Sequence, residues 1–405
     1  AVDYVRYLEA PFKSAEYLRR RSEKTLPAAF NVLTRINRLP RFVVGAVIGV
    51  TRTIERLVRC DRDVERFLRA MSPNAVFVSP LVTLGPSSAR QTEVVKAARA
   101  LRMPIMVGVA SWDHLTSKGL IRIAPDALAV WNQAQADEAV SLHRVPRSRV
   151  VVTGAQSLDH WFEPVPSYSM SQLRVQLGIA PGRRVILFVG SSRNMAPGSS
   201  EVRFVHRWVA ALRAASSEAL RNAVVIVRPH PTNTEPWRGD PPAGVVVHPR
   251  EYSGIPLSDD EVEVFRRSIL ASDVVVGINT TAMIEAAILQ RPVLSVRDEE
   301  FLHSQAGTLH FDHLPIEAGG CTVVAATLDE HVQQLESALS NPGPHVAAGR
   351  TFTHRFVRPL GIDEPATQHL CNAIERVAGG GAHAPAVVSR HADASVPSRI
   401  GPADA

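Results

Sequence analysis

The chain has 405 residues with 45 Lys or Arg and 39 Asp or Glu, a length that fits two domains of ordinary size. Its longest apolar run, Phe42 to Val50, spans nine residues and is too short to cross a bilayer, so we expect no transmembrane helix. The three cysteines are far apart and share no metal-ligand or redox spacing, which indicates a reducing, cytoplasmic compartment.

The positive charge is concentrated in residues 1–70, which hold fifteen Lys or Arg and eight Asp or Glu, against a net charge of +6 for the whole chain. Arginines there alternate with apolar residues such as Phe42, Val47 and Ile54. This pattern is typical of a helix on an anionic membrane surface, here the inner face of the plasma membrane; the alternative is a solvated helix face packed on its own domain. Nucleic acid is not an expected partner, because the segment lacks interleaved aromatic residues and matches no base-reading module.

From Ala75 onward, short apolar strands alternate with helices, which predicts a parallel α/β domain. We expect strands over residues 75–78, 105–109, 127–130 and 150–152, and helices over residues 88–101 and 134–143. A doubly wound domain usually opens with a strand, so two interpretations are open for residues 1–74. Either upstream strands of the first domain precede this chain, or the segment is a helical extension.

Polar side chains crowd the loop that follows the predicted strand 105–109, where Ser111, Trp112, Asp113, His114 and Lys118 stand close together. So many polar side chains at the exit of a strand suggest the part of an active site that binds the acceptor substrate. Asp113 or His114 could take a proton from an acceptor hydroxyl, and the choice between them is open. Lys118 either holds a phosphate or is a solvated surface charge.

A Pro- and Ser-containing stretch, 163–171, interrupts the pattern and predicts a domain boundary. We assign 1–165 to an acceptor-side domain, 166–378 to a nucleotide-donor domain and 379–405 to a disordered tail. Strands are expected over 185–189, 223–227, 245–247, 273–276 and 293–296, and helices over 202–214, 261–270, 282–289 and 366–377. The fold class is therefore α/β, with two doubly wound, Rossmann-like domains facing across a cleft and a helical N-terminal segment. The stretch 152–162 either lines the cleft or, through Trp161 and Phe162, packs between the domains, and it is not assigned to the catalytic set.

Arg228 and His230 stand at the exit of the predicted strand 223–227, where Pro229 and Pro231 flank the histidine. The prolines hold His230 rigidly at the carboxyl end of a strand, where open α/β sheets bind ligands. A histidine there can donate to a leaving phosphate, and Arg228 can grip it in a bidentate way. The alternative is a turn histidine satisfied by backbone, with Arg228 solvated.

The predicted strand 273–276 runs directly into a helix through Asn279, Thr280 and Thr281, and Glu285 follows on the same helix face as Thr281. The hydroxyls accompany unpaired backbone N–H groups, which suits an anion. The alternative makes Thr281 an ordinary N-cap and Glu285 its capping-box acid, although a capping box wants a spacing of three and here it is four.

Ser191, Ser192 and Arg193 follow the predicted strand 185–189, where small residues and backbone amides often approach a diphosphate. Neither G-x-x-x-x-G-K-[ST] nor G-x-G-x-x-G occurs, which argues against a P-loop ATPase and an NAD-dependent dehydrogenase. A loop expected over the cleft carries His303, His310, Asp312 and His313, whose spacing matches no metal-ligand pattern. We therefore expect no metal and no cofactor, with a nucleotide-activated donor as substrate.

Three of these motifs together resemble the glycosyltransferase-B superfamily, and within it the CDP-glycerol glycerophosphotransferase-like and bacterial surface-carbohydrate biosynthesis proteins. The segment from Thr280 to Glu285, followed by Arg291-Pro292, is similar to that family's S-S-x-x-x-D followed by R-P. Arg228-Pro-His230-Pro is similar to its H-P motif, and Trp112 with Lys118 is similar to W-H-G-T-P-L-K. The family's first-domain histidine falls at Asp113 here, with His114 beside it.

The resemblance implies a metal-independent transferase that moves a glycosyl or polyol-phosphate group from a nucleotide-diphosphate donor to a cell-surface polysaccharide or lipid-linked acceptor. Arg228, His230, Thr280 and Thr281 would stabilise the departing phosphate, and Glu285 would hold ribose or donor hydroxyls. Two alternatives are open. One is a non-hydrolysing UDP-sugar 2-epimerase, whose H-R-R-E-N signature is faintly echoed by residues 192–194; the other is a non-catalytic glycan-binding protein with a degenerate donor site.

Overall fold

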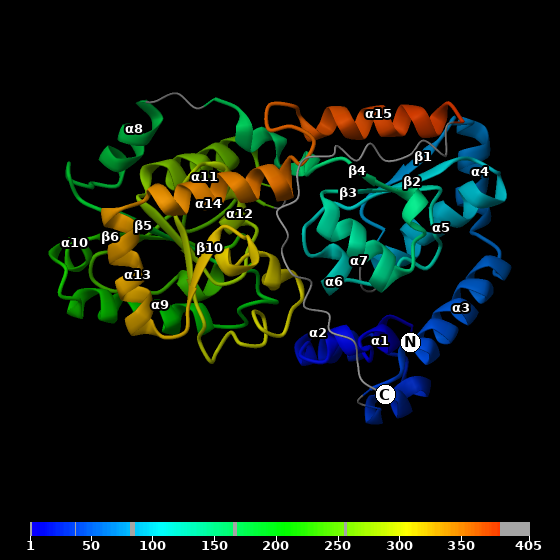
Figure 1. Cartoon of the computed structure of the whole chain (residues 1–405), viewed down its shortest axis with the longest axis horizontal. Helices are drawn as coiled ribbons and strands as arrows, with labels where there is room; N and C mark the ends of the chain where they lie inside the picture. Colours follow the sequence, from blue (N-terminus) through cyan, green and yellow to red (C-terminus); the bar gives the residue numbers. More distant parts are fainter. Residues whose placement is uncertain (1, 37, 82–85, 165–167, 255–256, 381–405) are drawn as a thin grey trace.

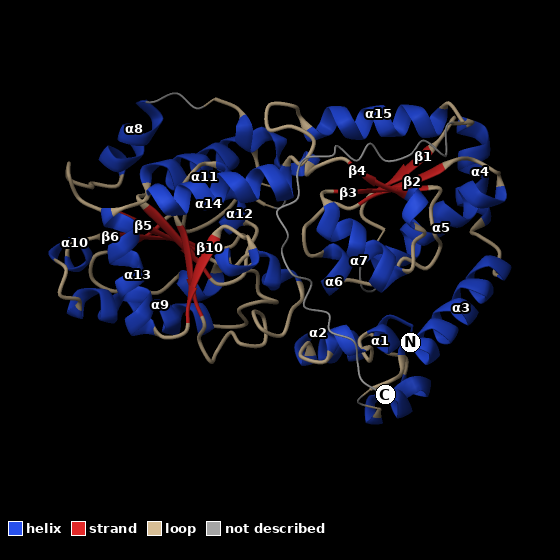
Figure 2. Ribbon diagram, in the orientation of Figure 1, coloured by secondary structure: helices blue, strands red, loops and turns tan. Residues whose placement is uncertain are grey.

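The computed structural model describes residues 2–36, 38–81, 86–164, 168–254 and 257–380, and its two lobes each enclose a parallel β-sheet flanked by helices (Figures 1 and 2). This arrangement confirms the two-domain α/β fold predicted from the sequence. The tail expected to be disordered lies, from residue 381 on, outside the described residues.

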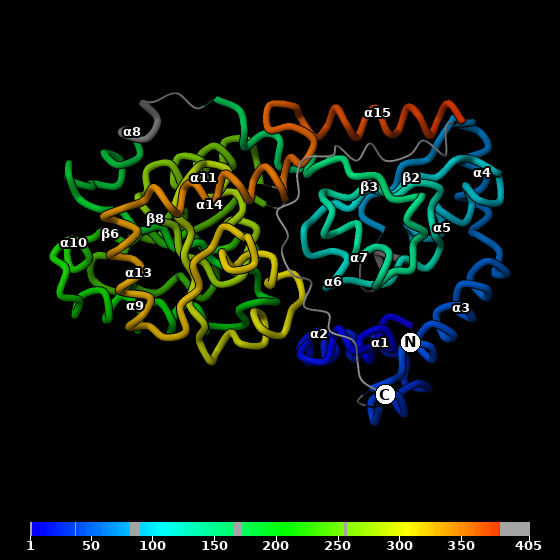
Figure 3. The backbone as a smooth tube through the Cα atoms, viewed as in Figure 1, coloured from blue at the N-terminus to red at the C-terminus, as the bar shows by residue number. Residues whose placement is uncertain are grey.

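The first domain is built on four parallel strands in the order β1-β2-β3-β4. They are β1 (Val76–Val78), β2 (Ile105–Gly108), β3 (Ala127–Val130) and β4 (Val150–Val152), connected by α5 (Pro86–Ala100), α6 (His114–Ser117) and α7 (Gln133–His143). Every residue of β2 and β3 is buried, as expected for continuous apolar strands covered on both faces. Figure 3 shows this compact unit in cyan.

The second domain contains six parallel strands in the order β10-β9-β8-β5-β6-β7. They are β5 (Val185–Val189), β6 (Val224–Arg228), β7 (Val245–Val247), β8 (Val274–Gly277), β9 (Val293–Val296) and β10 (Thr322–Ala325). From β5 the chain builds the sheet outward first through β6 and β7, then in the opposite direction through β8, β9 and β10. The boundary between β5 and β8 is therefore a topological switch point, where open α/β sheets leave a crevice for ligand.

Helices cover both faces of this second sheet. On one face α9 (Ser200–Ala214) and α13 (Leu328–Ser340) pack against β5 and β8 in one buried apolar cluster. On the other face α11 (Asp259–Ala271), α12 (Ala282–Ile288) and α14 (Gly343–Phe352) form a second cluster. The shorter helices and helical turns are α8 (Tyr168–Gln176), α10 (Glu218–Arg221), η3 (Arg147–Arg149), η4 (Gln156–Phe162), η5 (Glu235–Trp237), η6 (His310–His313), η7 (Ile316–Ala318) and η8 (Thr353–Val357).

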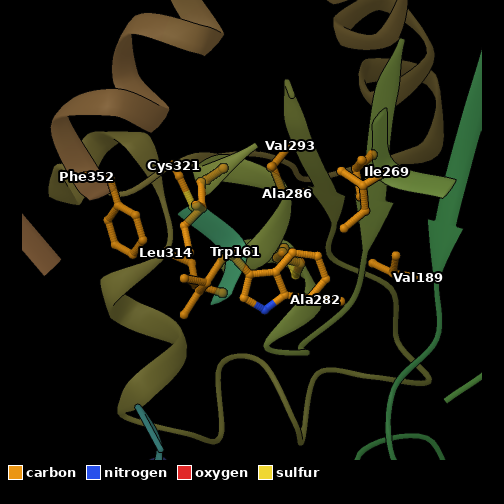
Figure 4. Close-up of a cluster of buried hydrophobic side chains, with 14 of the residues drawn as sticks. Trp161, Val189, Ile269, Ala282, Ala286, Val293, Leu314, Cys321 and Phe352 are labelled. Carbon is orange, nitrogen blue, oxygen red and sulfur yellow. The ribbon is translucent and has the colours of Figure 1, made fainter. Parts of the chain in front are cut away.

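Apolar side chains join the two domains. Trp161, from the end of the first domain, lies among second-domain side chains that include Ala282 and Leu314 (Figure 4). Trp112 and Trp131 of the first domain belong to the same buried cluster. Of the two alternatives for residues 152–162, packing of Trp161 between the domains is confirmed.

The last helix, α15 (Ala366–Ala378), returns to the first domain and lies along its sheet (Figure 1). Its buried residues, such as Leu370 and Ala373, pack on Met106 of β2 and Ala129 of β3. Its position in the sequence lies within 166–378, yet its packing belongs to the first domain. An amphipathic helix pattern shows that one face is buried but not which sheet buries it.

The N-terminal segment is helical throughout its described part, as expected: α1 (Val2–Arg6), η1 (Ala10–Phe12), α2 (Glu16–Glu23), η2 (Ala28–Arg35), α3 (Arg41–Leu57) and α4 (Arg62–Met71). Helices α1 to α3 run beside the first domain, where the chain is coloured blue (Figure 1). Among the described residues, none of the helices combines the length and the apolarity that spanning a bilayer requires.

Candidate functional site

A small pocket of about 110 Å³ lies between the domains, where the carboxyl ends of β5, β6 and β8 meet at the switch point. Both domains and the N-terminal segment contribute to its wall. The described residues that line it are Arg21, Trp112, Asp113, Lys118, Ser192, Asn194, Met195, His230, Asn279, Thr280, Thr281 and His310. The sequence motifs thus converge on one place.

His230 is held at the exit of β6 with a defined tautomer. Its Nδ1 accepts hydrogen bonds from the Thr232 backbone N–H at 3.1 Å and from the Thr232 hydroxyl at 2.9 Å. In the neutral ring the proton is therefore on Nε2, which becomes a hydrogen-bond donor. Burial lowers the pKa of His230 to about 4, so the ring is neutral at physiological pH.

Gly190 lets the loop after β5 lie against the exit of β6. A Cβ at this position would come within 2.8 Å of the His230 backbone nitrogen and 3.1 Å of the Arg228 carbonyl oxygen. The loop then turns so that Ser192 faces the pocket, while Ser191 is buried and donates its backbone N–H to Glu201 Oε1 at 2.6 Å. Burial raises the pKa of Glu201 to about 8, which makes this carboxyl a neutral support for the loop at physiological pH.

Thr280 and Thr281 begin the turn into α12, and Thr281 does not cap the helix. Its side chain makes no capping hydrogen bond, and its Oγ1 instead accepts one from Trp112 Nε1 at 3.1 Å. The capping-box alternative for Thr281 and Glu285 is therefore wrong: the hydroxyl that it needs is engaged by the other domain.

His310 is a second histidine in the pocket and connects the two domains. Its Nδ1 lies 3.1 Å from the Thr116 hydroxyl and its Nε2 lies 3.3 Å from Asn279 Nδ2. Its ring meets the edge of Trp112 with 4.9 Å between centroids. Burial lowers the pKa of His310 to about 4, so it too is neutral at physiological pH.

Asp113 lies in the pocket wall with its carboxylate already engaged. It accepts hydrogen bonds from Ser111 Oγ at 2.7 Å and Ser117 Oγ at 2.6 Å, and Lys118 Nζ lies 3.6 Å away. Burial alone would raise the pKa of Asp113, but Lys118, His114 and the Ser117 hydroxyl together hold it below its usual range. Asp113 is thus well placed but weakly basic.

His114 follows Asp113 at the start of α6 but is not among the residues that line the pocket. Its Nδ1 is buried and has no hydrogen-bond partner among the described residues. Burial lowers the pKa of His114, more than neighbouring Asp113 raises it. The two candidate bases therefore differ in position: Asp113 lines the pocket and His114 does not.

Arg228 and Glu285 lie outside the pocket lining, although the sequence placed them with its motifs. The guanidinium of Arg228 is buried 4.2 Å above the ring of Phe265 and 5.3 Å from that of Tyr252, and its Nη1 has no hydrogen-bond partner among the described residues. Burial raises the pKa of Glu285 to about 8, and Arg228 opposes this shift. Ser111, Ser191 and Arg193 also fall outside the lining; Arg193 is exposed.

Four lining residues carried no usable sequence signal. Met195 belongs to no motif, Asn194 entered only through the faint echo of the epimerase signature, and His310 was considered only as a metal ligand on the loop expected over the cleft. Arg21 is one of many arginines in the N-terminal segment, and nothing in its local pattern separates it from its neighbours.

No protein-family model matches the chain. No curated protein sequence matches it either. Among solved structures, it is similar to a putative UDP-N-acetylglucosamine 2-epimerase from Listeria monocytogenes, with 13% identity, 81% of this chain and 79% of that chain covered, and a TM-score of 0.49. S. aureus MnaA, in a co-structure with UDP, gives 15% identity, 93% and 94% coverage and a TM-score of 0.49. The wall teichoic acid polymerase TagF gives 12% identity, 78% and 85% coverage and a TM-score of 0.44. Likenesses at these scores assign no activity.

The pocket presents hydrogen-bond donors of the kind that bind phosphate oxygens: an imidazole N–H, threonine and serine hydroxyls, an ammonium group and a guanidinium. Among the described residues, no group of three or more His, Cys, Asp or Glu side chains is arranged to hold a metal ion.

Proposed function

We propose that the pocket binds the diphosphate of a nucleotide-activated donor. The protein would then be a transferase that moves a glycosyl or polyol-phosphate group to a hydroxyl of a cell-surface polysaccharide or lipid-linked acceptor. The observation that carries this proposal is the convergence of His230, Thr280 and Ser192 at the switch point of the second sheet. Three strand exits supply neutral donors to one small space that faces the other domain.

In the proposed reaction the acceptor hydroxyl oxygen forms a bond to the anomeric carbon or the phosphorus of the donor. The bond from that atom to the nucleotide phosphate oxygen breaks, and its electron pair leaves with the phosphate. The hydroxyl proton passes to Asp113 or His114. Negative charge that develops on the leaving phosphate is stabilised by the Nε2–H of His230 and by the hydroxyls of Thr280 and Ser192.

Arg228 and Glu285 support the donor from outside the pocket lining in this proposal. The unpartnered Nη1 of Arg228 is a buried charged donor, and an anionic or carbonyl oxygen of the nucleotide would satisfy it. Glu285, neutral because its pKa is raised to about 8, can both donate to and accept from a ribose or donor hydroxyl.

The first experiment is a calorimetric titration of the whole chain with CDP, UDP, GDP and CMP. We expect one base to bind selectively. The double variant Thr280→Ala/Thr281→Ala should lose that binding, and Thr351→Ala, an exposed threonine on α14, should keep it. Absence of binding to every nucleotide by the unaltered chain would overturn the donor site and favour the non-catalytic glycan-binding alternative.

The second experiment identifies the reaction with the activated donor of the base that binds. Release of nucleotide together with a glycosylated or polyol-phosphate-bearing acceptor is the expected result. A donor sugar epimerised at C2, with no transfer, would overturn the transferase in favour of the 2-epimerase.

We also propose that α3 and α4 contact an anionic membrane surface from the cytoplasmic side. Thirteen large hydrophobic side chains are found exposed in the described part of the chain, and nine of them lie between Phe30 and Met71. Leu57 is 78% exposed and Phe42 77%. Arginines accompany them: a hollow of about 700 Å³ beside the end of α3 is lined in part by Arg56, Arg59, Arg62, Arg99 and Arg149. Exposed apolar residues beside arginines suit a bilayer of anionic lipid.

Vesicle co-sedimentation tests the membrane contact. Deletion of residues 1–70 would also remove α1, which packs on the first domain, and could disturb the fold. Substitutions on the exposed surface avoid this problem. We expect the chain to pellet with phosphatidylglycerol vesicles and not with phosphatidylcholine vesicles, and Leu57→Ser/Val58→Ser to weaken pelleting. Val175→Ser, which removes an equally exposed valine from α8, is the control. Equal pelleting of all three proteins on both kinds of vesicle would contradict the proposal.

A further inference from the structure

Helix α1, at the start of the N-terminal segment, and the residue that follows it support the loop that carries the acceptor-side residues. Arg6 is fully buried and donates to the carbonyl oxygens of Lys118 at 3.0 Å and Gly119 at 3.3 Å, and also to that of Leu115. Tyr7 adds a hydrogen bond from its hydroxyl to the Lys118 carbonyl at 2.8 Å. A buried guanidinium that satisfies three carbonyl groups fixes the backbone of the loop behind the pocket.

The same segment also reaches the second domain. The hydroxyl of Tyr17 donates to the carbonyl oxygen of Asn194, a residue of the pocket wall, and its ring lies 5.1 Å from that of His303. Leu18 belongs to a small apolar cluster that joins Leu142 of α7 in the first domain to Leu309 of the second. Helix α2 therefore bridges the two domains at the edge of the pocket.

Arg21 follows Tyr17 by four residues on α2, so both side chains share one helix face. Arg21 lines the pocket, and its Nη1 is buried without a hydrogen-bond partner among the described residues. No carboxylate of the described chain lies within ion-pair distance of Arg21. Its neighbour Arg20, in contrast, is exposed and pairs with Glu16 at 2.6 Å.

The charges in the pocket single out Arg21. Lys118 is offset by Asp113 at 3.6 Å. His230 and His310 are neutral, because burial lowers the pKa of each to about 4. Of the described residues that line the pocket, Arg21 therefore supplies the one positive charge that no neighbouring acid balances.

We propose that Arg21 binds the distal phosphate of a nucleoside diphosphate, so that the N-terminal segment completes the donor site across the domain boundary. The inference rests on the proposed donor function. In this proposal Ser192, His230 and Thr280 of the second domain contact the phosphates from one side of the pocket, and Arg21 reaches the outer phosphate from the N-terminal side. A guanidinium suits the oxygens of a phosphate better than a point charge does.

The test is a calorimetric titration of the intact chain with the nucleoside diphosphate that binds best and with the corresponding monophosphate. For Arg21→Ala we expect about tenfold or greater loss of diphosphate affinity and nearly unchanged monophosphate affinity. Arg20→Ala, in the same helix, is the matched control and should bind both as the unaltered chain does. Arg21→Lys should recover only part of the loss.

Tyr17→Phe keeps the packing of α2 and removes the hydroxyl that reaches Asn194; an intermediate loss of diphosphate affinity would support the bridge. Equal melting temperatures of the variants show that affinity, not folding, has changed. Unchanged diphosphate affinity of Arg21→Ala would overturn this inference and leave the donor site standing. Equal losses for diphosphate and monophosphate would also overturn it, because Arg21 would then not act on the distal phosphate. Failure of the unaltered chain to bind any nucleotide would instead sink the proposed function.

Discussion

Trp112 of the first domain donates its indole N–H to the Thr281 hydroxyl of the second, with 3.1 Å between Nε1 and Oγ1. Both residues line the pocket, so the bond that joins the domains is also part of the candidate site. The relative position of the two domains therefore affects the geometry of the candidate site. A change in the angle between the domains would move the acceptor-side loop and the donor-side turn relative to each other.

The Trp112–Thr281 bond can be measured by a double-mutant cycle. Trp112→Phe and Thr281→Val each remove one partner. We expect the two losses of unfolding free energy to be non-additive by about 1 kcal/mol, because the second substitution has no bond left to break. Denaturant unfolding of the four proteins gives the coupling, and strictly additive losses would show that the bond contributes nothing.

His230→Ala should abolish turnover, by about a hundredfold or more, and leave the melting temperature nearly unchanged. The reason is that His230 lines the pocket, where its Nε2–H is the proposed donor to the ligand, while the close contact of Gly190 with the backbone of residues 228–230 does not need the imidazole. His206→Ala, an exposed histidine of α9, is the control. A collapsed fold in His230→Ala would make this histidine structural. Since the pKa of His230 is about 4, the pH–rate profile should show no step near 6.5 that this substitution removes.

Glu201→Gln should stabilise the protein at alkaline pH. The pKa of Glu201 rises from its usual 4.5 to about 8 on folding, so the folded state binds the proton more tightly. Its contribution is fully present below pH 4.5 and is lost as the pH rises through 8, at a cost on the order of 4 kcal/mol. Glutamine keeps the oxygen that accepts from Ser191 and cannot ionise.

The melting temperatures of the Glu201→Gln variant and the unaltered chain should therefore agree near pH 4.5 and diverge up to pH 8. A constant difference across this range would mean that Glu201 is already ionised in the fold.

Gly190→Ala should destabilise the protein by about 1–3 kcal/mol, because the added Cβ meets backbone atoms of residues 228–230 that cannot move independently. Gly49→Ala is the matched control: nothing lies within 4 Å of its Cβ, and alanine favours the helix α3 by up to about 1 kcal/mol. Chemical denaturation should show a lower free energy of unfolding for Gly190→Ala and a higher one for Gly49→Ala. A neutral Gly190→Ala would show that the two strand exits can separate freely.

Much of the fold followed from the sequence because the central strands are continuous apolar runs between helices. The predicted ranges are matched by five strands: β3, β4, β5, β7 and β9. Four more, β1, β2, β6 and β8, differ from the predicted ranges by one residue at one or both ends. Strand β10 was missed although it is as long as β9 and its sequence is largely apolar. Helix α13 was missed although a signal existed: Thr327 accepts from the Glu330 backbone N–H, the spacing of a capping box.

The site was predictable where it consists of strand exits. Ser192, His230 and Thr280 meet because the carboxyl ends of parallel strands lie at one edge of the second sheet, and Trp112 and Asp113 reach the same pocket from a strand exit of the first sheet. Their roles stay predictions. Arg21 could not be found in this way, because Arg6 ties its segment to Leu115, more than a hundred residues away, and no local pattern encodes such a contact.

The chain passes between the domains twice, once after Phe162 and again before α15. Arg358 pairs with Asp159 at 2.7 Å, and Asp159 also accepts the Ala366 and Thr367 backbone N–H groups at 3.0 and 2.7 Å. The two passages are thus held side by side, and two adjacent connections constrain rotation of one domain about the other more than a single connection would. Neither half is a complete module alone: cutting the chain after Phe162 would strip the first sheet of α15, so an isolated first domain would need that helix supplied in trans.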